Sequence, residues 1–279
     1  MHFSPAERRQ ELAITLKSYR ENAGLDSTKV SRHLGWDPSK ISRIEGGRFK
    51  RINLRDVLDM LAMYGITDET DLQNLVQIVR ESRTRGWWEE YADLLSDLPN
   101  LEAGAVTIQT YELLCVPGLL QTREYAAAMF RGLGITDEGA IARRVTARMT
   151  RQEVLARQDP PELHAVIDEA ALLKSVGGPD VMREQIYRLI ELAALPNVTV
   201  QVIPNSIGAH AAMTMPFTVM SFSGERALRI VYVEMAVTPV ISYRSEDVES
   251  CSTIYDQLVA SALSPEDTVA AMHSIAARS

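Results

Sequence analysis

Four polar side chains near residue 40 could recognise nucleic acid. They combine hydroxyl groups with cations on one side of a predicted helix: Ser39, Lys40, Ser42 and Arg43. Such groups hydrogen-bond to phosphate oxygens, and an arginine can also pair with the edge of a guanine. Ile41 and Ile44 stand three residues apart and would face the opposite way. The pattern predicts a helix over residues 38–45 that packs on one side and contacts DNA on the other.

The residues before this helix predict another short helix and a tight turn. Val30 and Leu34 stand four residues apart, which indicates an amphipathic helix over 27–34. Ser31 is small, as required where a second helix crosses closely. Gly35 follows where a turn would need a positive φ, which is cheap only for glycine.

The helix over 38–45 has start signals of its own. Asp37 is a favoured N-cap residue, and Pro38 suits the first helical position. Two short helices joined by three residues are typical of a helix-turn-helix. The alternative is an ordinary helical hairpin in a bundle. That alternative does not require the small residue, turn glycine, cap and polar outer face all at once.

Two neighbouring segments would hold the motif on the DNA backbone. Thr28 and Lys29 open the first motif helix. The glycine-rich loop 46–53 carries three cations: Arg48, Lys50 and Arg51. We expect these side chains to contact phosphates, because phosphate contacts orient a protein on the duplex. Double-stranded DNA is therefore the expected partner of this region.

Charge is divided unevenly along the chain. Residues 1–65 contain 12 Lys and Arg against 8 Asp and Glu, whereas residues 66–279 contain 17 against 29. The net charge is +4 over the first segment and -12 over the second, within a total of -8. A basic head on an acidic body is expected of a DNA-binding domain joined to a regulatory one, because the acidic part repels DNA.

Length and composition favour a chain of two domains in the cytoplasm. The 279 residues are 46% hydrophobic, contain no apolar run long enough to span a membrane, and begin without the apolar segment of a signal peptide. Cys115 and Cys251 give neither a disulfide framework nor metal-ligand spacing, and the 5 histidines are scattered. We expect no cofactor and no bound metal.

Helical periodicity continues on both sides of the motif. It predicts three further helices, over 5–23, 53–64 and 68–83. Residues 1–83 would then form an all-helical DNA-binding domain. Residues 84–104 contain Trp87, Trp88 and Tyr91, which are too aromatic for a solvated linker. They predict a packed helical connector.

The remaining residues, 105–279, predict an α+β domain. Residues 105–158 are expected to be helical, and their last helix carries a basic face: Arg143, Arg144, Arg148, Arg151 and Arg157. We expect that face to be solvated or to pair with a partner, not to form a second DNA site. From residue 160 onward the period changes. It predicts strands over 163–167, 198–204, 217–222 and 227–234, and helices over 177–195, 246–262 and 265–277. This order indicates a small mixed sheet packed with helices.

Both parts of the chain resemble a known family. The helical head, with the motif as its second and third helices, resembles the lambda-repressor-like Xre/Cro family. The segment PGLLQTREYA (117–126) resembles the signature of a large set of actinobacterial Xre-type regulators. Further matches to that set cover most of 105–262: ARMTRQEVL (147–155), VIDEAAL (166–172), the segment 177–204, GAH (208–210), PFTVMSF (216–222) and VYVE (231–234).

The resemblance implies a function and partners. Such proteins are described as WhiJ-like developmental regulators and as antitoxin-like regulators, with a C-terminal domain of unknown function. Members are often encoded beside a small protein of another family, so a small neighbour-encoded protein is the implied partner. A small-molecule effector is the other implied ligand. The family usually has a glutamine where this chain has Thr28, so this chain's contact at that position differs.

Candidate site residues of the second domain fall into two groups. Asp168 lies at a predicted strand end, His210 lies in the longest loop, and Glu234 ends a strand. The PGLLQT segment either locks a helix turn against the core or helps to form a groove for a partner or effector. The residues that would line such a groove are Leu119, Leu120, Gln121 and Tyr125. No nucleophile partner or metal spacing accompanies either group, so we expect a binding site and not an enzyme.

These observations predict a sequence-specific DNA-binding transcriptional regulator that is controlled through its C-terminal domain. We expect a homodimer, because helix-turn-helix proteins commonly bind two half-sites one helical turn apart. The alternative is an antitoxin that sequesters its small partner and regulates its own operon. A third, weaker hypothesis is an enzyme with its site near Asp168, His210 and Glu234.

Overall fold

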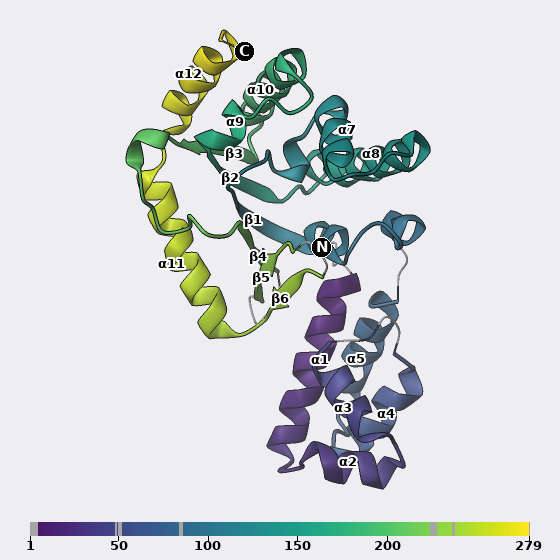
Figure 1. Ribbon diagram of the computed structural model, residues 1–279. Coiled ribbons are helices and arrows are strands. Elements are labelled where there is room, and N and C mark those ends of the chain that lie inside the picture. Colours follow the sequence, from purple (N-terminus) through teal and green to yellow (C-terminus); the bar gives the residue numbers. More distant parts are fainter. Residues whose placement is uncertain are drawn as a thin grey trace. The chain divides into compact units, whose positions relative to one another are not determined.

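The computed structural model describes residues 5–47, 49, 52–83, 86–223, 228–235 and 238–278 (Figure 1). The chain divides into two compact units. The first comprises residues 1–92 and 97–104, and the second comprises residues 93–96 and 105–279. The predicted basic-loop contacts Arg48, Lys50 and Arg51 lie outside the described residues. No helix in the described ranges is long and apolar enough to cross a membrane.

The first unit is built from helices whose bounds agree with the sequence prediction to within two residues. They are α1 (Pro5–Asn22), α2 (Ser27–Leu34), α3 (Pro38–Glu45), α4 (Leu54–Met63) and α5 (Glu69–Glu81). Their apolar faces meet in one core that includes Leu12, Leu16, Val30, Ile41, Ile44, Val57 and Leu61. The predicted all-helical head with its helix-turn-helix is therefore confirmed.

Local capping explains why the motif helices begin and end where they do. The side chain of Asp26 accepts a hydrogen bond from Lys29 N, and that of Asp37 accepts one from Ser39 N. Gly35 has φ +65°, a left-handed conformation that ends α2 at low cost only for glycine. These contacts stay within three residues of each cap, so the sequence pattern could predict them.

The connector residues are packed, as predicted. A 3-10 helix, η1 (Trp87–Tyr91), sets the Trp87 ring edge-on to those of Trp88 and Tyr91, with centroids 6.0 and 5.9 Å apart. Helix α6 (Leu98–Gly104) follows and contacts α1. It ends at the residue before a strand of the second unit begins.

The second unit contains a mixed six-stranded sheet of order β3-β2-β1-β4-β5-β6. Its strands are β1 (Ala105–Glu112), β2 (Glu162–Asp168), β3 (Val198–Ile203), β4 (Phe217–Phe222), β5 (Arg229–Val233) and β6 (Val240–Ser242). Strands β1, β2 and β3 are parallel to one another, whereas β4 pairs antiparallel with β1 and β5. The predicted α+β domain with a mixed sheet is confirmed.

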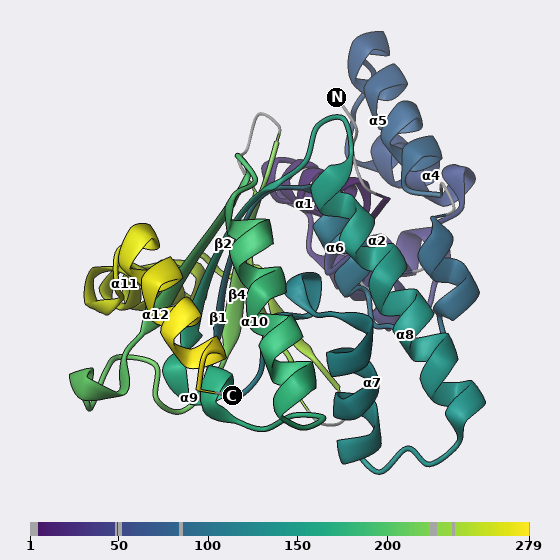
Figure 2. The same cartoon turned by 90° about the horizontal axis from the view of Figure 1, so that it is seen from above.

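Helices cover both faces of this sheet. They are α7 (Arg123–Gly132), α8 (Glu138–Gln152), α9 (Glu169–Leu173), α10 (Pro179–Ala193), α11 (Ser245–Ser261) and α12 (Pro265–Ala276), with short 3-10 turns η2 (Gly118–Leu120), η3 (Glu153–Ala156) and η4 (Asn205–Ile207). Figure 2 shows α7, α8 and α10 on one side of the sheet and α11 on the other. Parallel strands need such crossover helices, which then bury the sheet on that face.

The prediction of helix over residues 105–114 is wrong. Residues 105–112 form β1, which lies in the middle of the sheet between β2 and β4. Four of its eight residues are β-branched: Val106, Thr107, Ile108 and Thr110. A high content of β-branched residues favours a strand, and pairing on both sides makes it one. Strand β6 was not predicted from the sequence either, since it is only three residues long.

The connection from β3 to β4 crosses the ends of two other strands. Strand β3 lies at one side of the sheet, and β2 and β1 separate it from β4. Residues 204–216 therefore pass over the carboxyl ends of β2 and β1. The chain anchors this long loop through hydrogen bonds, beginning with Asn205 N, which donates to Glu169 Oε2 at 2.8 Å.

Candidate functional site

Helix α3 presents the polar face that the sequence predicts. Ser39, Ser42 and Arg43 are exposed and Lys40 is half-buried, whereas Ile41 and Ile44 are buried in the core of the first unit. The two faces of α3 are thus separated as DNA recognition requires: one is fixed by packing and the other is open to a ligand.

Contacts within the unit hold Lys40 and Ser39 of the predicted recognition side chains. Lys40 Nζ lies 2.9 Å from Asp56 Oδ2 and 3.7 Å from the centroid of the Trp36 ring. Ser39 donates both its N–H and its hydroxyl to Asp37 Oδ1, and these hydrogen bonds lower the pKa of Asp37. Lys40 must leave Asp56 before it can contact DNA, so Arg43 is the more accessible cation of this face.

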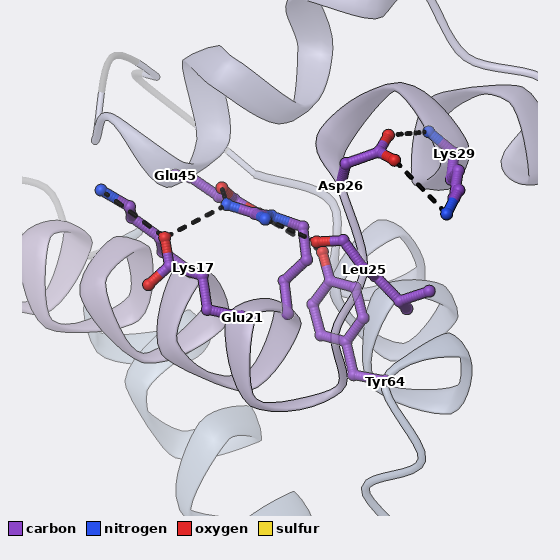
Figure 3. A network of polar contacts seen from close by, with 8 residues as sticks. Lys17, Glu21, Leu25, Asp26, Lys29, Glu45 and Tyr64 are labelled. Carbon is purple, nitrogen blue, oxygen red and sulfur yellow. Dashed lines mark hydrogen bonds and ion pairs between the residues drawn. The ribbon is translucent and has the colours of Figure 1, made fainter.

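The two residues at the start of α2 that are predicted to contact phosphates are open to solvent. Thr28 and Lys29 are exposed. Lys29 donates its backbone N–H to Asp26 Oδ1, and its Nζ lies 3.7 Å from Asp26 Oδ2. Figure 3 shows both contacts of Lys29 with Asp26. An exposed pair of this kind is weak and opens readily to a phosphate.

A largely buried ion pair, which the sequence did not predict, fixes the end of α3. Arg20 Nε lies 2.7 Å from Glu45 Oε1, and Arg20 Nη2 lies 2.8 Å from Glu45 Oε2 (Figure 3). Arg20 Nη1 also donates to the carbonyl oxygen of Leu25, just before α2. One guanidinium thus joins α1, the last residue of α3 and the approach to α2. Arg20 and Glu45 are 25 residues apart in the sequence, and no local pattern signals such a pair.

Burial affects a phenol beside this pair. Tyr64 Oη lies 3.5 Å from Glu45 Oε1. Burial and then the charge of Glu45 raise the pKa of Tyr64 well above its ordinary value, with Arg20 opposing them. The phenol is therefore neutral at all physiological pH values and can donate to the carboxylate.

The structure places the PGLLQT side chains inside the second unit. Leu119, Leu120, Gln121 and Tyr125 are each at most 4% exposed. The Tyr125 hydroxyl accepts a hydrogen bond from Val116 N at 3.1 Å. The geometry thus matches the first of the two interpretations, a helix turn locked against the core. A direct role of these side chains in a partner or effector site stays a prediction.

Buried amides hold this segment to two helices. Gln121 Nε2 donates to the Val116 carbonyl at 2.7 Å, and Gln121 Oε1 accepts from Arg148 Nη1 at 2.7 Å. Gln185 of α10 accepts from Thr122 N at 2.7 Å and donates to the Leu120 carbonyl at 2.8 Å. An irregular buried backbone needs such partners, because unpaired N–H and C=O groups are costly. Sequence reasoning missed Gln185, since a glutamine on a helix carries no local signal of burial.

Asp168 and His210 come together, whereas Glu234 lies apart from them. His210 Nε2 is 3.4 Å from Asp168 Oδ2, and its ring is edge-on to Tyr111 at a centroid distance of 5.8 Å. Asp168 Oδ1 caps α9 by accepting from Ala170 N at 2.8 Å. This pair anchors the 204–216 loop over the ends of β2 and β1. Two of the three residues of the hypothetical enzyme site thus serve to anchor a loop.

The charge of Glu234 acts instead on Glu112, a carboxyl that was not predicted from the sequence as a site residue. Glu112 Oε2 accepts from Cys115 Sγ at 3.4 Å. Burial raises the pKa of Glu112 to about 7 against the opposing hydrogen bond from Cys115, and Glu234 adds to the increase. Glu112 escaped notice because residues 105–114 were predicted to be helical. It actually lies at the carboxyl end of the central strand.

The predicted basic face lies on α8 except for Arg157, which follows η3, and its side chains make contacts within the second unit. Arg143 makes a bidentate ion pair with Asp93, at 2.6 and 2.9 Å. Arg144 donates to the Ala140 carbonyl, and Arg157 donates to the carbonyls of Asp159 and Ala105. These contacts tie the arginines to groups of the same unit, and the expectation that the face does not form a second DNA site stays a prediction.

The second unit also has a shallow depression that could hold a small molecule. It measures about 440 Å³ and lies between α7, α8 and the start of α10. Alanine and valine side chains form part of its wall, and the ion pair of Arg131 with Glu138 stands beside them. In the part of the chain that the structure describes, no three His, Cys, Asp or Glu side chains are grouped to hold a metal ion.

Comparisons with known proteins agree with these two units. Residues 11–75 match the family model of a helix-turn-helix domain. Residues 95–274, well over half of the chain, match the model described as a domain of unknown function (DUF5753). No curated protein and no solved structure matches the chain. The chain therefore belongs to the DUF5753 family, and it carries that domain behind a helix-turn-helix domain suited to binding DNA.

Proposed function

We propose that this protein is a sequence-specific transcriptional regulator that binds double-stranded DNA as a homodimer. The observation that carries the proposal is the two-sided character of α3. Its inner face is fixed by Ile41 and Ile44 in the core and by the Arg20–Glu45 pair at its end. Its outer face exposes Arg43 together with Ser39 and Ser42. A rigid helix with an exposed arginine can enter the major groove and pair with a guanine.

Control would enter through the second unit. That unit contributes most of the -12 charge of residues 66–279, and such an acidic surface is a poor ligand for DNA. Following the WhiJ-like resemblance, we propose that a small neighbour-encoded protein or a small-molecule effector binds it and changes the DNA affinity of the head. The unit would then act by binding and not by catalysis. The use of Asp168 and His210 as a loop anchor supports this view.

The experiment that tests the proposal is DNA binding by an Arg43→Ala variant. A site is first selected from a random duplex pool with the full-length protein. Arg43→Ala should weaken binding to that site by ~1–3 kcal/mol while changing binding to random DNA much less. Arg188→Ala is the matched control, since Arg188 is an exposed arginine of α10 paired with Glu191 at 3.1 Å. Equal losses on selected and random DNA would reduce Arg43 to a phosphate contact.

Two further measurements address assembly and control. Light scattering should give a dimer at micromolar concentration, and a monomer bound singly to its site would contradict the proposal. Titration of the site with and without the small neighbour-encoded protein should change DNA affinity ~5–150-fold, the usual range of such coupling. If the partner is toxic alone and harmless with this protein, while DNA affinity is unchanged, the antitoxin alternative holds instead.

A further inference from the structure

The carboxyl ends of the parallel strands define one edge of the sheet. Strands β1, β2 and β3 run in the same direction and end there. The antiparallel β4 begins at this edge, because Phe217 pairs with Tyr111 near the end of β1. Strand β5 ends at it and β6 begins at it, because Val233 pairs with Val240. In Figures 1 and 2, α9 and the green loop that follows β3 lie near each other at this edge.

Exposed apolar side chains are concentrated at this edge. Most of the exposed large apolar side chains of the described residues stand on the segments that leave it or enter it. They have exposed fractions between 42% and 54% and form what we call the carboxyl-edge surface: Leu114, Leu173, Ile207, Met213, Met215, Met235 and Val240. The others are scattered over both units: Leu58, Val106, Leu133, Tyr187 and Leu195.

Such a concentration indicates a binding surface. A single exposed leucine is normal on a folded protein, but a group of them on one edge marks a place where another molecule docks. Three of the seven are methionines, Met213, Met215 and Met235. Methionine is flexible and polarizable, and it is used on surfaces that adapt to a helix laid against them.

The charges at the same edge are mostly acidic. Glu112 and Asp168 are the last residues of β1 and β2, Glu169 follows Asp168, and Glu234 follows the end of β5. Glu112 is offset by the nearby Arg151 and Arg148, and Asp168 is buried beside His210. The charges that these segments leave for a partner are therefore Glu169 and Glu234 against Lys174. Glu234 is exposed, and Glu169 is half-buried. A partner that covers the apolar side chains would therefore gain from basic groups along its margins.

We propose that the carboxyl-edge surface docks an amphipathic helix of a partner protein whose polar face is basic. Six strands spaced ~4.8 Å apart span ~24 Å, which a helix of ~16 residues would cover. An extended strand is a poorer occupant, because it would pair along an outer strand of the sheet, β3 or β6, and would not lie across the carboxyl ends. On β3, Leu263 N and Thr268 Oγ1 already bond the carbonyl and N–H of Val202. The inference rests on the proposed function for the role of the partner, and it adds where and by what chemistry the partner binds.

The probe for the test is a designed helix of ~18 residues with leucine on one face and lysine on the other, labelled with a fluorophore. Its binding to the full-length protein is followed by fluorescence anisotropy. Met213→Gln and Met235→Gln should each weaken binding about five- to tenfold, as expected when an anchor at an interface is lost. Glu234→Gln should weaken it about two- to fivefold. Leu133→Gln is the matched control and should change nothing, because Leu133 is 71% exposed but lies at the end of α7.

Methionine methyl spectra provide a second readout that does not depend on affinity. The probe should shift the methyl signals of Met213, Met215 and Met235, assigned by single substitution. It should leave the signals of the buried Met60 and Met182 unchanged. Unshifted edge methionines, or an equal response to a leucine–glutamate peptide, would overturn the proposal. A loss of self-association in the methionine variants would mean that a second copy of this chain is the occupant, which also overturns it.

The docking inference and the proposed DNA-binding function can each fail without the other. DNA affinity is measured on the same variants. If the protein binds its selected DNA site but the probe does not map to the edge, the docking inference is wrong and the regulator remains. If the probe maps to the edge but no duplex is bound specifically, the docking inference holds and the proposed function is wrong.

Discussion

The recognition helix and the carboxyl edge of the sheet distribute polar and apolar side chains in opposite ways. On α3 the polar groups face outward, and the apolar ones lock the helix into the core. At the sheet edge the Asp168–His210 pair and the glutamine contacts lie inside, whereas seven large apolar side chains face outward. The first arrangement suits a charged, hydrated ligand such as DNA, and the second suits a protein surface. On these two proposals, one chain carries two interfaces of different chemistry.

The way each region is held together differs as well. The first unit orients its recognition helix with a buried pair of full charges, Arg20 and Glu45, whose side chains are 12% and 7% exposed. The second unit holds its irregular PGLLQT segment largely with neutral amides such as Gln121 and Gln185. Buried charges are costly when one partner is lost, because the other remains uncompensated.

Arg20→Ala is expected to produce the largest change in the free energy of unfolding. It leaves Glu45 buried without its partner and should lower the free energy of unfolding by ~3–5 kcal/mol. Chemical denaturation followed by circular dichroism measures the loss. Lys17→Ala is the control, because the Lys17–Glu21 pair is exposed and its atoms are 4.0 Å apart. It should cost under about 1 kcal/mol. Similar losses in the two variants would mean that the buried pair does not dominate the stability of the head.

Glu112→Gln is expected to change the free energy of unfolding by less, in a pH-dependent way, and to raise it where Arg20→Ala lowers it. The folded protein holds the pKa of Glu112 at about 7, above the ordinary value of 4.5. The folded state therefore binds a proton that the unfolded chain releases, and stability is lost as the pH rises from about 4.5 to 7. At about pH 8 the glutamine variant should be more stable than the parent by ~1–3 kcal/mol. The difference should vanish below about pH 4.5, and a pH-independent difference would contradict the assignment.

Ser31→Ala, in α2 of the helix-turn-helix, is expected to produce the smallest change in stability. Ser31 is 2% exposed, and its buried hydroxyl has no hydrogen-bond partner among the described residues. Removing the hydroxyl should raise stability by up to about 1 kcal/mol, while the small size needed at the helix crossing is kept. Ser31→Val, which adds bulk there, should instead destabilise the head. Thermal melts compare the two variants. A loss of stability in the alanine variant would show that the hydroxyl has a partner in solution.

Much of the first unit could be predicted because its determinants are local. Asp26, Asp37 and Gly35 act on backbone groups within three or four residues, so the sequence alone determined where α2 and α3 begin and end. The outward placement of Ser42 and Arg43 followed from helical spacing. The division of charge between residues 1–65 and 66–279 is likewise a property of the sequence by itself, because it depends on residue types and not on how they pack.

Only the tertiary structure decided the features that depend on distant residues. Residues 105–112 became the central strand because β2 and β4, which lie far along the chain, pair with them. The same pairing brought Glu112 to the end of a strand, and the crossing of residues 204–216 brought His210 to Asp168. Arg20 met Glu45 through the packing of α1 against α3. Short-range periodicity cannot encode these contacts, because each one forms only when chain segments far apart in sequence pack together.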